Sequence, residues 1–450
     1  MRWRQRAARL LSAGTALACA AAGLSGCSTA DPVPASVHDD AAATPPMGWS
    51  SWSFIRQDPT AADIDAQARA LKTSGLLAHG YRQVNLDDFY YLDPATQVDM
   101  FGRWATDRAK FPDGIAAVAA YVHSQGERFG IYLTPGVPVA AYKRNTPIQG
   151  TTFHAQDIVS DTSRFETNYN FGPGSMYYID YQRNPVAAQA FLNSWADELA
   201  EWGVDYVKLD GIDTGNLAEL QHWAIALKQT GRSIYLGLSN GSGLPDSGVW
   251  RDYANSWRID HDVECYCADS SYPLTEWANV AGRFTDLAAW QHDAGPGGWN
   301  DLDSLEVGNG AADGLTAAER QTQVTLWAMA NAPLMLGTDL THLDPADTAL
   351  LTNDQVIAVD QSGHPAHLVG QAGSQEVWAT ANGDGSFTVA LFNLGNAAAN
   401  VTATWASLGF AGAADVHDLW SHADLGSLAG SVSAGLAPHA SRLFSVRPGR

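Results

Sequence analysis

Acidic side chains follow three short apolar runs of the sequence. Asp87 and Asp88 end the first run, Asp210 ends the second, and Asp262 ends the third. A carboxylate beside a buried run is costly unless it faces a polar site. One ionised carboxylate can attack a carbon atom as a nucleophile, while a second, protonated one serves as general acid. Together the three acidic ends favour a functional site over unconnected helix caps or loop residues.

Lys208 strengthens the case for Asp210 as a nucleophile. The two residues are two positions apart, so on a strand their side chains point to the same side. A neighbouring cation keeps a carboxylate ionised at moderate pH. The residues alone do not choose the general acid, because Asp260, Asp262 and Asp301 all remain candidates.

These acids need strands that end on a common face. Runs rich in β-branched and aromatic residues predict strands, and amphipathic runs that end near glycines predict helices. The predicted strands cover residues 81–87, 128–134, 205–210, 233–239, 256–263 and 333–340. The predicted helices cover residues 61–73, 114–124, 186–202, 217–230, 274–290 and 317–331. Repeated strand–helix units predict a parallel sheet, and eight of them would close an α/β fold of the (β/α)8 TIM barrel type.

A barrel of this kind binds substrate at the carboxyl ends of its strands. A doubly wound sheet is the structural alternative, but no Gly-x-Gly-x-x-Gly motif follows the first strand. An aromatic and polar insertion, residues 135–185, separates one predicted strand from its helix. This insertion either contributes to the site or is a structural excursion.

After residue 363 the alternation of strand and helix patterns gives way to short β-prone runs. Short β-prone runs at 376–380, 386–393, 399–405 and 441–446 are separated by Gly, Asn and Ala, which predicts a C-terminal antiparallel β-sandwich. We therefore predict a catalytic barrel over residues 45–362 and a sandwich over residues 363–450. We expect the sandwich to cap the barrel rather than to bind sugar.

The amino terminus reads as an export signal. Four arginines precede an apolar run that is too short to span a membrane, and the run ends in Leu-Ser-Gly before Cys27. This predicts a lipoprotein signal peptide over residues 1–26, a lipid-modified Cys27 and a flexible tether over residues 27–44. The alternative is an ordinary secretory signal that is cut nearby. Either reading makes the protein exported, and an N-terminal lipid is its only expected link to a membrane.

Neither a metal nor a cofactor is expected. His261, Asp262, Glu264, Cys265 and Cys267 resemble a metal cluster, but on a strand they would point to opposite sides. Whether Cys265 and Cys267 form a disulfide stays open. A cofactor-dependent barrel is disfavoured, because lysines are scarce and no phosphate-binding glycine loop is visible.

The charge balance narrows the class of partner. The chain has 48 acidic and 26 basic residues and a net charge of −22, which excludes the basic footprint of a nucleic-acid-binding protein. It also has 16 Trp, 15 Tyr and 14 Phe. Aromatic faces stack on sugar rings and carboxylates bind hydroxyl groups, so an oligo- or polysaccharide is the expected partner. A Trp-rich core is the alternative reading of the aromatic residues.

Several ordered motifs resemble glycoside hydrolase family 27, the α-galactosidase family. They are TPPMGWSSW at 44–52, LDD at 86–88, GIY at 130–132, VKLDG at 207–211, WRIDHD at 257–262, PGGWNDLDSLEVGNG at 296–310, APLMLGTDL at 332–340, VHDLW at 416–420 and PH at 438–439. The resemblance covers about residues 44–447. It implies a barrel followed by a β-sandwich and a double-displacement mechanism that retains the anomeric configuration.

The resemblance also implies residue roles. Asp210 falls on the family's nucleophile and Asp262 on its acid/base. The positions that hold the sugar in the −1 subsite are Trp52, Asp87, Asp88, Tyr132, Lys208 and Arg258. Asp260 shares a predicted strand face with Asp262, which leaves a supporting role open for it.

Departures from the family pattern concern the sugar. Ser239 stands where α-galactosidases often carry Glu, and a smaller residue there is similar to the α-N-acetylgalactosaminidases. Ile212 replaces a usual Cys, and Leu302 and Ser304 replace a Pro and a Met. The family's early disulfide pattern is also missing. The LTPG run at 133–136 and the insertion after it resemble the bacterial isomalto-dextranase branch.

An α-galactosidase is therefore the favoured activity. The alternatives within the family are isomalto-dextranase, α-N-acetylgalactosaminidase and β-L-arabinopyranosidase. An alternative from another class is a non-catalytic surface protein that binds sugar. The retention of both Asp210 and Asp262 speaks against that alternative.

Overall fold

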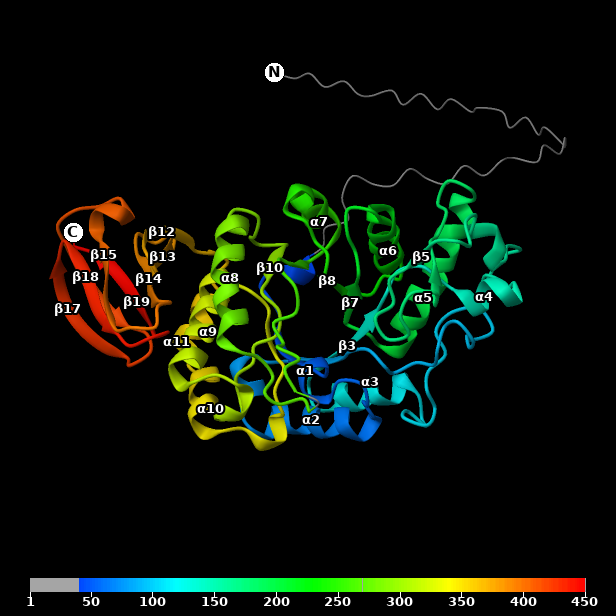
Figure 1. Cartoon of the computed structure of the whole chain (residues 1–450), viewed down its shortest axis with the longest axis horizontal. Helices are drawn as coiled ribbons and strands as arrows, with labels where there is room; N and C mark the ends of the chain where they lie inside the picture. The colour runs from blue at the N-terminus through cyan, green and yellow to red at the C-terminus, as the bar shows by residue number, and fades with distance from the viewer. Residues whose placement is uncertain (1–39, 269, 450) are drawn as a thin grey trace, which may run out of the picture. The chain divides into compact units, whose positions relative to one another are not determined.

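Eight parallel strands form the centre of the computed structural model, which describes residues 40–268 and 270–449 (Figure 1). The order of the strands around the sheet is β10-β9-β8-β7-β3-β2-β1-β11. A parallel bridge between Leu305 and Leu336 links the two ends of this order. The strands are β1 (Met47–Ser50), β2 (Gln83–Leu86), β3 (Arg128–Leu133), β7 (Tyr206–Asp210), β8 (Tyr235–Ser239), β9 (Ser256–Arg258), β10 (Trp299–Asp301) and β11 (Leu334–Leu336). The sheet curls as a TIM-type barrel, which confirms the predicted α/β fold class.

Helices follow the strands, as the right-handed crossover of βα units requires. The helices are α1 (Trp52–Ile55), α2 (Ala61–Thr73), α3 (Ile115–Ser124), α5 (Pro185–Trp202), α6 (Leu217–Gln229), α7 (Ser247–Tyr253), α8 (Trp277–Trp290), α9 (Ala317–Ala330), α10 (Pro345–Leu351) and α11 (Asp354–Asp360). Short 3-10 turns are η2 (Leu76–His79), η4 (Leu244–Asp246), η5 (Gly310–Asp313) and η6 (Leu340–His342). Helix α2 begins with a capping box of Thr60 and Asp63, and Gly203 ends α5 in the left-handed region.

Strand β9 is shorter than the sequence predicts. The alternation of residues 256–263 indicates one long strand, but β9 ends at Arg258. Asp260 and Asp262 therefore lie in the loop that follows, and the strand period does not apply to them. Asp260 forms an ion pair with Arg283 of α8 and does not line the cavity described below, so its predicted shared face with Asp262 is wrong.

The insertion between β3 and α5 has its own small sheet. Its elements are β4 (Val137–Pro138), α4 (Val139–Arg144), η3 (Ala155–Ile158), β5 (Phe165–Glu166) and β6 (Met176–Tyr177), and its strand order is β4-β6-β5. The insertion is tied to the barrel through the buried carboxylate of Glu219 on α6. Glu219 Oε1 accepts from the Gly136 amide at 2.9 Å, and its Oε2 accepts from the Tyr181 hydroxyl at 2.7 Å. A carboxylate with donors from both ends of the insertion holds its two roots together.

The C-terminal part of the chain is antiparallel. A six-stranded sheet in the order β12-β13-β14-β19-β16-β17 faces the pair β15-β18 across an apolar core that includes Val389, Trp405 and Val416. The strands are β12 (His367–Ala372), β13 (Gln375–Ala381), β14 (Phe387–Asn393), β15 (Ala399–Thr404), β16 (Ala413–Asp418), β17 (Ala423–Ala429), β18 (Ser431–Leu436) and β19 (Ser441–Pro448), with η7 (Trp405–Leu408) after β15. The predicted β-sandwich is confirmed.

The described chain starts at the amino-terminal end of the barrel. Residues Asp40–Ala42 form the turn η1, and Ala42 is fully buried. The carbonyl of Ala42 accepts from the indole nitrogen of Trp299 at 3.0 Å and from the Gly297 amide at 2.9 Å. The predicted signal peptide and the predicted lipid site at Cys27 lie outside the described residues. Within the described residues, none of the helices has the length and apolar character needed to cross a membrane.

Candidate active site

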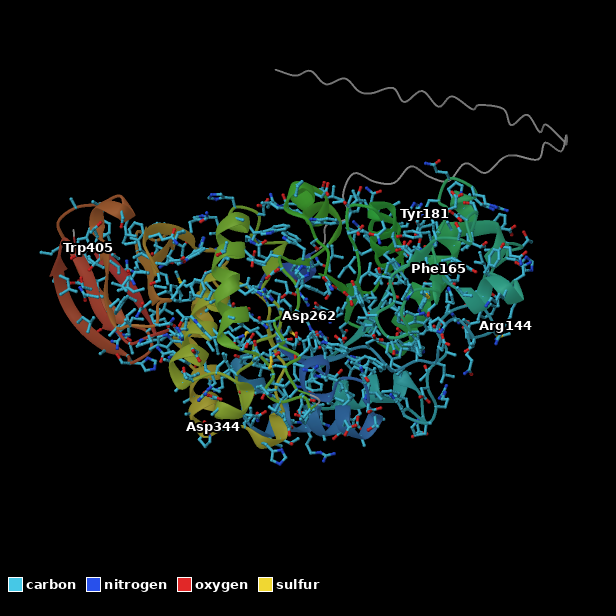
Figure 2. The ribbon with its side chains drawn as sticks, in the orientation of Figure 1. Arg144, Phe165, Tyr181, Asp262, Asp344 and Trp405 are labelled. Carbon is cyan, nitrogen blue, oxygen red and sulfur yellow. A yellow bond between two sulfur atoms is a disulfide. The ribbon has the colours of Figure 1, made fainter. Side chains whose placement is uncertain are left out.

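A polar cavity of about 170 Å³ opens at the carboxyl ends of the barrel strands. It is lined by Trp52, Asp87, Asp88, Tyr132, Tyr169, Lys208, Asp210, Ser239, Asn240 and Asp262. Asp262 is labelled among the side chains of the barrel in Figure 2. Apart from Arg258, every residue that the sequence predicts for the site lines this cavity, and Arg258 contacts two of the lining residues. The structure thus brings the predicted set together from β3, β7, β8, β9, the start of α1 and the loops after β2 and β9.

Asp210 ends β7 with its carboxyl group buried. Its Oδ2 accepts from the Tyr132 hydroxyl at 3.0 Å, and Tyr132 lies in register with Lys208 on the neighbouring strand. Asp210 Oδ1 has no hydrogen-bond donor within the described part of the chain. One oxygen is therefore held in place, while the other is free to approach a ligand in the cavity.

Lys208 makes its direct contact with Asp87 rather than with Asp210. The distance from Lys208 Nζ to Asp87 Oδ2 is 2.7 Å, and the Ser50 hydroxyl lies 3.4 Å from the same oxygen. The charge of Lys208 still acts on Asp210, whose pKa it lowers against the effect of burial. The prediction that these two residues share a strand face is consistent with this arrangement, since both line the cavity.

Asp88 lines the cavity and has one oxygen without a hydrogen-bond donor in the described structure. Its Oδ1 accepts from the Phe89 amide at 2.8 Å, whereas Oδ2 is buried and has no donor among the residues described. Burial, with a smaller effect from the charge of Asp87, raises the pKa of Asp88 to about 7. A buried acceptor without a partner costs free energy, so the hydroxyl group of a bound sugar would be favoured at this position.

Arg258 organises the side of the cavity that contains Asp262. Its Nη2 binds Asp262 Oδ1, and its Nη1 donates to Asp303 Oδ1 at 2.8 Å and to the Ser239 hydroxyl at 3.2 Å. Asp303 also accepts from the Val263 amide at 2.8 Å, which fixes the loop next to Asp262. The remaining oxygen of Asp262, Oδ2, accepts from the Tyr266 hydroxyl at 2.5 Å.

The two central carboxyl groups have opposite pKa shifts in this ligand-free site. Burial raises the pKa of Asp210 to about 7, although Lys208 and Arg258 oppose the shift. Burial also acts against ionisation of Asp262, but Arg258 and the Tyr266 hydroxyl outweigh it and lower the pKa of Asp262 to about 2. Between these two pKa values the pair therefore carries one proton, and in the absence of a ligand the shifts favour its placement on Asp210.

Sequence reasoning missed three residues at this site, namely Tyr169, Asn240 and Tyr266. Tyr169 comes from the insertion, lines the cavity and receives a hydrogen bond from the Asn240 amide at 3.3 Å. Tyr266 lies between Cys265 and Cys267, which form a disulfide. The aromatic residues of the insertion were the only sequence signal for Tyr169, and the Cys-Tyr-Cys motif was the only one for Tyr266.

Three acidic side chains, one of which is Asp262, converge beside the cavity. Carboxylate oxygens of Asp262, Glu264 and Asp303 lie within 4.8 Å of one another, so only Asp262 and Glu264 of the five residues weighed in the sequence belong to this group. Each of the three accepts from a protein donor, with Ser53 donating to Glu264 Oε1 at 2.5 Å. Arg258 offsets part of their charge.

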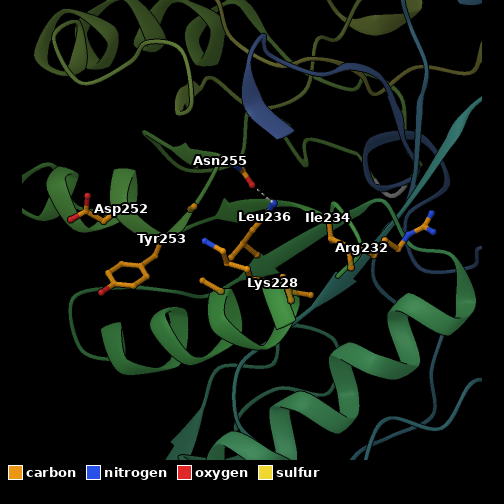
Figure 3. A pocket seen from close by; sticks show the side chains of 10 residues that line it. Lys228, Arg232, Ile234, Leu236, Asp252, Tyr253 and Asn255 are labelled. Carbon is orange, nitrogen blue, oxygen red and sulfur yellow. Dashed lines mark hydrogen bonds between the residues drawn. The ribbon is translucent and has the colours of Figure 1, made fainter. Parts of the chain in front are cut away.

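A second hollow lies between α6, β8 and α7 (Figure 3). It is lined in part by Lys228, Arg232, Asp252 and Tyr253, and its volume is about 30 Å³. Asn255 at its edge accepts from the Leu236 amide at 2.8 Å, which is a structural role. This volume is too small for a sugar ring, so the hollow is not a candidate for the active site.

Comparisons with known proteins agree with this geometry. A family model described as alpha galactosidase A matches residues 44–159 and 174–362, and a model described as the alpha galactosidase C-terminal beta sandwich domain matches residues 372–446. The α-galactosidase of Coffea arabica is 34% identical over 413 residues, which cover 90% of this chain and 94% of that protein. Human α-galactosidase A is 30% identical over 374 residues, which cover 78% of this chain and 74% of that protein.

The fold is also similar to solved structures. A β-L-arabinopyranosidase of glycoside hydrolase family 27 from Geobacillus stearothermophilus, in complex with arabinose, matches with a TM-score of 0.82 at 29% identity. The match covers 91% of this chain and 98% of that one. Residues 160–173, which include Tyr169, fall between the two segments that the first family model matches.

Proposed function

The chain is a glycosidase that belongs to glycoside hydrolase family 27, the α-galactosidase family, and from this premise we propose that it removes terminal α-D-galactosyl residues with retention of the anomeric configuration. The observation that carries the proposal is the pair Asp210 and Asp262 in one cavity with Lys208 and Arg258. The related α-galactosidases support the choice of sugar.

The two carboxyl groups divide the reaction between them. Asp210 Oδ1, the oxygen without a donor in the described structure, attacks the anomeric carbon and forms a glycosyl ester. Asp262 donates its proton to the glycosidic oxygen as that bond breaks. Asp262 then takes a proton from water, whose oxygen attacks the anomeric carbon and releases Asp210. Tyr132 keeps Asp210 oriented through its hydrogen bond of 3.0 Å.

Cavity-lining acceptors and cations bind the sugar. Asp87 and Asp88 offer acceptors for the O4 and O6 hydroxyl groups, and the free Oδ2 of Asp88 supports this role. Lys208 donates toward sugar oxygens from its position on Asp87. Trp52 supplies an apolar wall, and Ser239, buried against Arg258, leaves room beside the 2-position.

The protonation state must change when substrate binds. The reaction needs an ionised Asp210 and a protonated Asp262, whereas the ligand-free site favours the reverse. The pair carries the right number of protons, so only the location of one proton has to change. Protonation of Asp262 removes a negative charge that raises the pKa of Asp210, which favours the ionised nucleophile.

A second candidate activity is the release of β-L-arabinopyranosyl residues. The structural match to a β-L-arabinopyranosidase with arabinose favours it. β-L-arabinopyranose has the ring configuration of α-D-galactose without the hydroxymethyl group, so the same catalytic pair would serve both sugars.

A substrate panel tests the proposal. We expect p-nitrophenyl α-D-galactoside to be cleaved with a higher kcat/KM than p-nitrophenyl β-L-arabinopyranoside, the N-acetylgalactosaminide or dextran. A reversed order between the first two would replace the galactosidase by the arabinopyranosidase. Hydrolysis of none of these substrates would remove the glycosidase mechanism itself.

Variants test the roles of the two acids. Asp210→Ala should lose turnover, and added azide should restore it with formation of a glycosyl azide, because a small anion can occupy the vacated place. Asp262→Ala should lose far more rate with sugar leaving groups than with activated aryl groups, which need no proton. Near-normal turnover of Asp210→Ala, or equal losses of Asp262→Ala on both leaving groups, would contradict the assignments.

Export with a lipid on Cys27 also remains a proposal, supported by the sequence of the amino terminus. Incorporation of labelled fatty acid into the wild type and its loss in Cys27→Ala would support it. Equal labelling of the two proteins, or no labelling of the wild type, would leave an ordinary secretory signal as the better reading.

A further inference from the structure

Tyr266 lies next to the cavity, in contact with the proposed acid/base and with Trp52. Its hydroxyl donates to Asp262 Oδ2 at 2.5 Å and accepts from the indole nitrogen of Trp52 at 2.8 Å. The tyrosine is 44% exposed, so it faces solvent on one side and the cavity residues on the other. It therefore lies between bulk water and the carboxyl group that must meet the leaving group.

The turn that carries Tyr266 is held in an unusual backbone conformation. Tyr266 has a φ of +47°, and the disulfide between Cys265 and Cys267 closes the turn on both sides of it. The amide of Cys265 donates to the Leu274 carbonyl at 3.0 Å, and the guanidinium of Arg56 lies 4.6 Å from the centre of the tyrosine ring. A left-handed conformation is costly for a side chain of this size and persists where surrounding bonds enforce it.

The two oxygens of Asp262 are not equivalent. Oδ1 is bound by Arg258, which is itself buried between Asp303 and Ser239 and has no room to leave. Oδ2 is bound only by Tyr266 within the residues described. A proton for the glycosidic oxygen must therefore come from Oδ2, the position that the tyrosine hydroxyl holds in the ligand-free protein.

We propose that Tyr266 is a positioning residue for Asp262: the disulfide-closed turn holds its hydroxyl on Oδ2 of the resting enzyme, and the leaving-group oxygen of the substrate takes its place. This inference rests on the proposed role of Asp262 as acid/base. The hydroxyl stabilises the carboxylate form of Asp262, and its displacement makes that carboxyl group easier to protonate. Entry of the leaving group and protonation of the acid are thereby one coupled event.

Other titratable groups around Asp262 set the background for this effect through whatever charge they carry. Arg258 at the end of β9 and Lys208 on β7 favour its ionised form. Asp210 on β7, Glu264 on the same loop and Asp303 after β10 act against it, and Tyr169 of the insertion lies within electrostatic reach. Only Tyr266 can be removed from this set without changing a charge or losing a residue that lines the cavity.

The test is the pH dependence of kcat/KM. The limb of the profile that disappears in Asp262→Ala reports the titration of Asp262. We expect Tyr266→Phe to move this limb upward by about one pH unit, since a hydrogen bond to a charged group has this strength. The matched control is Tyr272→Phe, because Tyr272 is in the same loop and donates to Asn309 instead. A limb that stays in place in Tyr266→Phe, or moves equally in Tyr272→Phe, would overturn the inference.

A second variant examines the disulfide. Replacement of both Cys265 and Cys267 by Ser should move the same limb in the same direction, and adding Tyr266→Phe should then have little further effect. If the cysteine variant leaves the limb in place, the disulfide has no part in positioning. Failure of the proposed function would give a different result. The pH profile of Asp262→Ala would then keep both limbs, and its rate would not depend on the leaving group.

Discussion

Glu264 is a buried acid that the proposed reaction does not consume. It lies two residues after Asp262, accepts from the Ser53 hydroxyl at 2.5 Å and has a second oxygen without a donor in the described structure. Burial, together with the nearby charges of Asp303 and Asp262, raises the pKa of Glu264 to about 8. Glu306, also fully buried, has its pKa raised by burial and by the charge of Glu264. In the folded protein, Glu264 and Glu306 therefore keep their protons to a higher pH than ordinary glutamate side chains do.

This gives a prediction about stability. The folded protein keeps a proton on Glu264 up to about pH 8, whereas the unfolded chain releases it near its ordinary pKa of 4.5. The stabilisation is complete below pH 4.5 and is lost as pH rises toward 8. We expect the wild type to lose stability in urea unfolding over that window, and Glu264→Gln to lose less, by up to about 1.4 kcal/mol per pH unit.

Glu276→Gln is the matched control for this prediction. Glu276 belongs to the same segment, at the start of α8, but its side chain is exposed. Its replacement should leave the pH slope unchanged. A Glu264→Gln protein with the wild-type slope would contradict a protonated Glu264 in the folded state.

Single residues differ in how far the sequence could predict them. Asp210, Asp262 and Lys208 stand in long motifs, so the resemblance alone assigns them. Tyr266 could not be assigned, because its role depends on contact with Trp52, which is 214 positions away in the chain. The contact of Lys208 with Asp87 has the same origin, since residues on two different strands must first be placed side by side.

At the scale of elements, the insertion brings to the cavity a side chain that lies outside the segments matched by the family model. Tyr169 is 49% exposed and belongs to the stretch 160–173 that the family model does not match. Its hydroxyl is held by Asn240, and its ring packs over Gly211, just after the proposed nucleophile. A ring in this position can contact the sugar on the leaving-group side.

We therefore expect Tyr169→Ala to raise KM for oligosaccharides by about tenfold, the effect of losing one aromatic contact of about 1 kcal/mol or slightly more. The KM for small aryl galactosides should change much less, because they lack the second sugar. Phe165→Ala is the control, since Phe165 is also exposed on the insertion but stacks on Tyr177 and does not line the cavity. Equal changes for both substrate types would argue against a contact with the leaving sugar.

The helices were easier to predict than the strands. Thr60 and Asp63 form a capping box at the predicted start of α2, and α5 and α9 also agree with their periodic patterns. Strands β1 and β10 have four and three residues, too few for a pattern, and they were not predicted as strands. Strand β9 was predicted too long, because the alternation continues into a loop that Arg258 draws toward Asp262 and Asp303.

At the scale of the whole molecule, the barrel core extends into the sandwich, which also has an apolar core of its own. Trp378, Phe392, Leu419 and Leu443 of the sandwich belong to the same buried cluster as the barrel residues. Polar and aromatic contacts add to this interface. The Nδ1 atom of His439 lies at a hydrogen-bond distance of 2.5 Å from Glu319 Oε1 of α9, and its ring stacks on Trp277 with the ring centroids 4.4 Å apart. Because these sandwich residues are buried in the barrel cluster, we expect the two parts to unfold together.

Calorimetry checks this expectation. We predict a single thermal transition for the full chain whose calorimetric and van't Hoff enthalpies agree. Removal of the sandwich after residue 362 should yield an aggregating barrel, because the apolar face of α9 and α8 would meet water. Two resolved transitions, or a soluble barrel with unchanged melting temperature, would contradict a shared core.

The burial of Ala42 places the start of the described chain at the end of the barrel opposite the cavity. Ala42 packs on Tyr206, Tyr235 and Trp299, and two of these, Tyr206 and Tyr235, begin strands β7 and β8, whose opposite ends carry Asp210 and Ser239 of the catalytic cavity. A support attached upstream of residue 40 would therefore hold the barrel by its base.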